Sequence, residues 1–88
     1  MADEEVLEVC INEGHLHGIF HGYRNRDTVF KMQGGASWMQ DEYLYEHHYL
    51  HSPRAKIIKL TDKATHKETF YMEVEGIKGR VRVRLAYL

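Results

Sequence analysis

Hydrophobic and polar residues alternate along most of the chain with the period of two that is typical of β-strands. Two alternating segments, 4–11 and 15–23, flank Gly14, which is a turn signal. We predict that they form a hairpin, because one register places every clear core residue on the same side. The predicted pairs are Leu7 with Phe20, Val9 with Gly18 and Ile11 with Leu16.

The C-terminal part predicts a second hairpin, from segments 69–75 and 80–87 around the turn 76–79. One face of this hairpin is apolar, and the other has opposite charges directly across from each other. The apolar pairs are Phe70 with Leu85, Met72 with Val83 and Val74 with Val81, and the polar pairs are Tyr71 with Arg84, Glu73 with Arg82 and Glu75 with Arg80.

Segments 28–32 and 54–60 are further predicted strands, whereas 37–51 is ambiguous. As a helix, this segment would begin at an N-cap, Ser37, and end before Pro53. As a strand, it would place its tyrosines on one face, with a bend near 39–42. We favour the strand and keep a helix over 38–50 as the alternative.

About six short strands in 88 residues predict an all-β fold, a small antiparallel barrel or sandwich of the SH3-like or OB-like kind. The length suits one domain, 1–88, with a thin core. We expect a cytoplasmic protein, because Cys10 is the only cysteine and the acidic start lacks the features of a signal peptide. No apolar run is long enough to cross a membrane.

The charge is divided between the two halves of the chain. Residues 1–53 carry three basic and nine acidic residues, and 54–88 carry nine basic and four acidic residues. This asymmetry favours pairing between the halves or self-association of the protein. The net charge of −1 argues against general attraction to nucleic acid.

Three stretches of the sequence resemble a group of small uncharacterised bacterial proteins. They are Gly35-Ala36-Ser37-Trp38-Met39-Gln40, Tyr43-Leu44-Tyr45, and Ser52 to Ile57. The shared features are a Gly, a Trp, a Gln two residues later, alternating tyrosines and a proline beside basic residues. The resemblance covers roughly residues 20–60 and favours the strand over the helix. It implies no activity.

The aromatic stretch is our main candidate for a binding site. Exposed together, its side chains would offer a flat surface to a protein or another partner, although core packing is the alternative. We expect a binding module and no enzyme, because no nucleophile motif or phosphate loop is present. The candidate binding residues are Trp38, Tyr43, Tyr45 and Tyr49.

Two other chemistries remain open. In the predicted N-terminal hairpin Cys10 lies across from His17, and a thiolate with imidazoles suits Zn²⁺, the one cofactor we consider. The zinc candidates are Cys10, His15, His17 and His21, and a second histidine group is His47, His48 and His51. Single-stranded nucleic acid is a weaker alternative, through Arg80, Arg82 and Arg84 with Tyr71.

Overall fold

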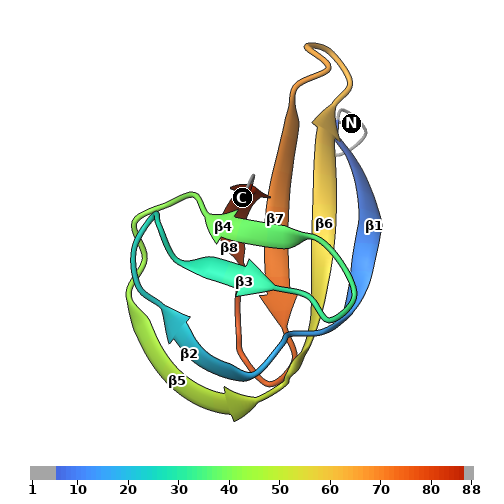
Figure 1. The fold of residues 1–88 in the computed structure, drawn as a ribbon. Helices are drawn as coiled ribbons and strands as arrows, with labels where there is room; N and C mark the ends of the chain where they lie inside the picture. Colours follow the sequence, from blue (N-terminus) through green and yellow to red (C-terminus); the bar gives the residue numbers. More distant parts are fainter. Residues whose placement is uncertain (1–5, 87–88) are drawn as a thin grey trace.

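A computed structural model describes residues 6–86, and this part of the chain is all-β, with eight strands and no helix. One sheet has six strands in the order β1-β6-β7-β8-β4-β3, and a second sheet pairs β2 with β5, all antiparallel (Figure 1). The strands are β1 (Val6–His15), β2 (Ile19–Tyr23), β3 (Val29–Lys31), β4 (Ser37–Gln40), β5 (Glu46–His51), β6 (Arg54–Asp62), β7 (Glu68–Val74) and β8 (Val81–Leu85).

The predicted all-β class is confirmed, and the two sheets do not close into a barrel. In Figure 1, β3 and β4 lie across the long strands β6 and β7, while β2 and β5 curve along the lower side. The six-stranded sheet therefore coils strongly, in the direction that strand twist allows. Within residues 6–86, no helix is long and apolar enough to span a membrane.

The predicted N-terminal hairpin is wrong. β1 pairs with β6 from Val6↔Asp62 to His15↔Arg54, with a bulge at Ile11, and β2 pairs with β5 instead. The chain does not turn at Gly14, which lies inside β1; it turns at Gly18, whose φ of 76° suits glycine. As a result Leu7, Val9 and Ile11, which we expected in the core, are exposed.

The predicted C-terminal hairpin forms, but its register differs by two residues. Met72 pairs with Val81, and Phe70 pairs with Val83. A shift of two keeps each side chain on its predicted face, because side chains alternate with a period of two. The turn is longer than predicted, and Ile77 within it packs against the core.

The ambiguous middle segment forms two strands, so the helix alternative is wrong. β4 ends at Gln40, and β5 begins at Glu46 after an irregular stretch. The bend that the strand interpretation required therefore exists, between the two strands. It carries the chain from the large sheet to the small one.

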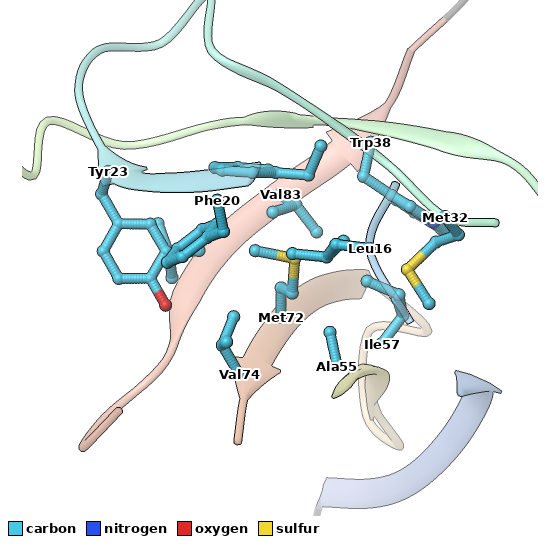
Figure 2. Packing of buried hydrophobic residues seen from close by; sticks show 12 residues of the cluster. Leu16, Phe20, Tyr23, Met32, Trp38, Ala55, Ile57, Met72, Val74 and Val83 are labelled. Carbon is cyan, nitrogen blue, oxygen red and sulfur yellow. The ribbon is translucent and has the colours of Figure 1, made fainter. Parts of the chain in front are cut away.

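The hydrophobic core lies between the two sheets (Figure 2). Side chains of β2 meet those of β7 and β8, with Leu16 near the middle of the cluster and Met32 beside Trp38 at one side. The buried cluster consists of Leu16, Phe20, Tyr23, Phe30, Met32, Trp38, Ala55, Ile57, Met72, Val74, Val81 and Val83. This packing fixes the small sheet over the large one.

Candidate functional site

The small sheet β2–β5 has two faces of different chemistry. Along β5, Glu46, His48 and Leu50 are half-buried, while the residues between them are exposed. Tyr43 and Tyr45 continue the same alternation ahead of the strand. The predicted alternation is confirmed within β5, and exposure alternates in the same way at Tyr43 and Tyr45 in the irregular stretch before it. We call the exposed set the tyrosine–histidine surface: Tyr43, Tyr45, His47, Tyr49 and His51, with His21 from β2.

The tyrosines of this surface are unusually open to solvent. Tyr43 is 85% exposed, Tyr45 75% and Tyr49 60%. Tyr49 makes edge-to-face contacts with His21, at 5.9 Å between ring centroids, and with His51, at 5.4 Å. The guanidinium of Arg26 lies 5.6 Å from the centroid of the Tyr43 ring. These ring–ring and cation–π contacts orient two of the tyrosines without covering them.

The opposite face of the small sheet packs against the core and so positions the tyrosine–histidine surface. The His48 ring stacks on Phe20 with 6.3 Å between centroids, and Tyr23 meets the same imidazole edge-on. At Gly22, β2 and β5 approach so closely that an added Cβ would lie 2.0 Å from the carbonyl oxygen of Glu46. Only glycine fits at this contact, and its φ of 102° also favours glycine.

Gln40 fixes the segment that carries Tyr43 and Tyr45. Its side chain is completely buried and makes three hydrogen bonds. Nε2 donates to the carbonyl oxygens of Glu42 and Leu44, both at 2.9 Å, and Oε1 accepts from the backbone N–H of Arg24 at 3.1 Å. The Gln of the G-x-x-W-x-Q-x-x-Y-x-Y pattern therefore has a structural role that sequence reasoning did not assign.

Trp38 does not belong to the exposed surface. Its side chain is 5% exposed and packs against Phe70, with 5.5 Å between ring centroids. The expectation that Trp38 contributes to a binding surface is therefore wrong, and core packing, its alternative, describes it. β4 presents Trp38 and Gln40 inward, because side chains two apart share a face.

Asp41 is a second residue that sequence reasoning did not single out. Its carboxylate accepts from Arg84 at 2.9 Å and from Arg26 at 3.1 Å, and Arg82 lies 3.7 Å away. Desolvation acts to raise the pKa of Asp41, but the hydrogen bonds from Arg26 and Arg84 and the charges of Arg84 and Arg82 outweigh it. The pKa of this carboxyl is therefore below its usual value.

The arginine row proposed for nucleic acid is paired within the protein. Arg80 lies over the Tyr71 ring at 4.5 Å and near Glu73 at 3.6 Å, while Arg82 and Arg84 bind Asp41. Tyr71 was expected opposite Arg84; because of the two-residue register shift it lies opposite Arg82. Nucleic-acid binding through this row stays a hypothesis.

The predicted adjacency of Cys10 and His17 is wrong, since Cys10 pairs with Ile58. His15 Nδ1 lies 2.8 Å from the carbonyl oxygen of Ser52, and His21 contacts Tyr49. In residues 6–86, no three His, Cys, Asp or Glu side chains are grouped so that they could hold a metal ion. Zinc binding by these residues therefore stays a hypothesis without a shared cluster behind it.

The strongest constellation in the described part of the chain is thus the tyrosine–histidine surface, which is supported by Gly22 and Gln40. It offers ring faces, hydroxyls and imidazoles, which are groups that recognise a partner through stacking and hydrogen bonds. Comparison with protein-family models, with curated proteins and with solved structures finds no match to this chain.

Proposed function

We propose that this protein is a binding module that recognises a protein partner through the tyrosine–histidine surface. The observation that carries the proposal is the exposure of Tyr43, Tyr45 and Tyr49 on a supported segment. A large ring exposed in a monomer is available for contact, and tyrosine is enriched among the residues that dominate binding energy at interfaces.

The support beneath the surface favours recognition. Tyrosine has only two side-chain torsions, so ordering it on binding costs less entropy than ordering a long flexible side chain. Gln40 holds the segment before β5 with three hydrogen bonds, and the stack of Phe20 and His48 lies under β5 itself. A surface arranged in this way suits a partner that presents apolar and hydrogen-bonding groups together.

We further propose that the module acts without catalysis, without a bound cofactor and in the cytoplasm. The single cysteine supports the compartment, since proteins of reducing compartments rarely rely on disulfides. The arrangement of groups on the surface supports binding, because rings and imidazoles dominate it.

The test is affinity capture by the immobilised protein, followed by calorimetry with each captured partner. The double variant Tyr45→Ser/Tyr49→Ser is expected to bind at least about tenfold more weakly, the effect of losing roughly 1.4 kcal/mol. The matched control is Val29→Ser, which changes an exposed residue of β3. Equal affinity of the double variant and the control for every captured partner would contradict the proposal.

A further inference from the structure

β1 carries apolar side chains that the described part of the chain leaves uncovered. Val6, Leu7, Val9 and Ile11 are between 39% and 50% exposed; Leu7 and Val9 share one face of the strand, Val6 lies on the other, and Ile11 lies at the bulge. Isolated exposed apolar residues need no explanation, whereas a contiguous run of them marks a surface that another molecule covers.

The backbone of β1 is also open along one side. β1 is the outermost strand of the six-stranded sheet, next to β6 (Figure 1). The only backbone hydrogen bond found on β1 beyond those to β6 is the one that its last residue, His15, accepts from Gln33, among the residues that the structure describes. An edge strand of ten residues with free N–H and C=O groups is a template for another strand. β3, at the opposite edge, has only three residues.

Basic residues of the protein lie near both acidic residues of β1. Glu13 lies 2.9 Å from Arg54, and Glu8 lies 3.8 Å from Arg80. Arg80 also lies 3.6 Å from Glu73, so it is shared between two carboxylates and offsets the charge of Glu8 only in part. An identical strand can therefore approach this edge only in a register that keeps the two copies of Glu8 apart.

We propose that the protein forms a two-fold symmetric dimer in which β1 pairs antiparallel with β1 of a second copy. A free peptide would lose conformational entropy on joining the edge, whereas β1 of a second copy is already extended by its pairing with β6. The dimer would join the two six-stranded sheets into one continuous sheet. This proposal is independent of the tyrosine–histidine surface.

The symmetry restricts the register of the pairing. A two-fold axis perpendicular to the sheet places a residue opposite its own copy, and we place Val9 at this position. Glu8 then lies opposite Cys10 of the second copy, whereas a register centred on Glu8 would set two carboxylates against each other. Residues 6–12 of both copies overlap; the pairing is regular over residues 8–10 and passes the bulge at Ile11 on either side, so at most about six hydrogen bonds form at roughly one per residue pair. Stable interfaces contain about 5 to 15.

The first test measures the mass of the protein by sedimentation between about 1 and 100 μM. The wild type is expected to be dimeric at the upper end, and Val9→Lys is expected to shift dissociation to at least tenfold higher concentration. The matched control, Val29→Lys on β3, changes a valine of similar exposure at the other edge and should sediment as the wild type does. A monomeric wild type at 100 μM, or an equal effect of the two variants, would overturn the proposal.

The second test fixes the register without disturbing the core. In Glu8→Cys the new thiol lies opposite Cys10 of the second copy, and directly opposed residues of antiparallel strands have the Cα separation that a disulfide needs. Mild oxidation should yield a covalent dimer, and Glu8→Cys/Cys10→Ser should lose most of it. No covalent dimer in Glu8→Cys, in a protein whose circular dichroism matches the wild type, would overturn this pairing.

Discussion

β5 and β1 both expose large side chains, but the two strands do so in different ways. β5 and β1 each have one neighbouring strand, β2 and β6 respectively. β5 lies on a stack of buried rings and presents tyrosine and histidine. β1 presents aliphatic side chains along a ten-residue edge of the large sheet. The first arrangement suits recognition by side chains, and the second suits pairing with another strand. Exposure alone therefore does not define a kind of site; the chemistry of the exposed side chains and the length of the open edge do.

The largest expected effect comes from Gly22→Ala, a substitution that disrupts the close contact between β2 and β5. Gly22→Ala would force a Cβ into the Glu46 carbonyl, so β2 and β5 must separate, and we expect a loss of at least about 3 kcal/mol in the free energy of unfolding. Urea denaturation measures this loss. Gly18→Ala is the control, because its φ is also positive but nothing lies within 4 Å of the added Cβ, so about 1 kcal/mol is expected. Equal losses in the two variants would contradict a close contact at Gly22.

The next largest effect is expected from Gln40→Met, which should loosen the segment ahead of β5. Gln40→Met keeps the side-chain length but removes three buried hydrogen bonds, at about 1 kcal/mol each, so a loss of about 2 to 3 kcal/mol is expected. The same denaturation experiment measures it, and amide hydrogen exchange at Arg24, whose N–H donates to Gln40, should become faster. Gln33→Met, at an exposed turn residue, serves as the control and should leave stability within about 0.5 kcal/mol.

A smaller effect concerns the buried face of β2. The Tyr23 hydroxyl is buried without a hydrogen-bond partner among the described residues, and burial, with Glu46 and Glu42 nearby, raises its pKa to about 12. Tyr23→Phe should therefore stabilise the protein by about 1 kcal/mol. In the wild type, stability should fall as the pH rises from about 10 to 12, because Tyr23 ionises there only in the unfolded chain.

Unfolding curves recorded at pH 8 and pH 11 check this prediction. The difference in stability between the two pH values should be smaller in Tyr23→Phe than in the wild type. Tyr45→Phe, which changes an exposed ring, should leave the difference as it is in the wild type. A pH dependence unaltered by Tyr23→Phe would contradict the assignment to Tyr23.

The smallest effect concerns Asp41, which links β8 to the segment before β5. Its lowered pKa means that its contribution to stability is present above the usual carboxyl value and is lost as the pH falls through the lower, folded value. Stability should therefore decline below about pH 4, and the decline should be shallower in Asp41→Asn. Thermal melting from pH 2 to 7 measures this, with Asp27→Asn as the exposed control. Identical profiles for the two variants would contradict the role of Asp41.

The sequence predicted which side chains share a face of a strand better than it predicted which strands pair with each other. Alternation identifies which side chains share a face, so the exposed side of β5 at Tyr49 and the apolar face of the C-terminal hairpin were predicted correctly, even though the register of that hairpin differs by two. Alternation does not identify the neighbouring strand. Leu7 and Phe20 would match across a hairpin, but β6 provides β1 with nine pairing partners that lie far along the chain.

The supporting residues were harder to predict, for a different reason. Gln40 is polar, and polar residues are usually exposed; only the nearby carbonyl oxygens of Glu42 and Leu44 make its burial favourable. Asp41 likewise acquires its role from arginines on β8 and in the turn after β2, which no local pattern associates with it. The sequence alone was compatible with Trp38 in the core or on the surface. The side chain is buried because it points inward from β4 at that position.

The pairing of β1 with β6 has a consequence for the time course of synthesis. Val6 pairs with Asp62, so β1 is synthesised first and cannot complete its pairing with β6 until Asp62 has been synthesised. At about 5 to 20 residues per second, roughly 3 to 11 s separate the synthesis of these two residues. During this interval β1 is an apolar segment without a neighbour in its own chain. On polysomes, where nascent copies lie close together, β1 strands of different chains can meet before either chain has completed its sheet.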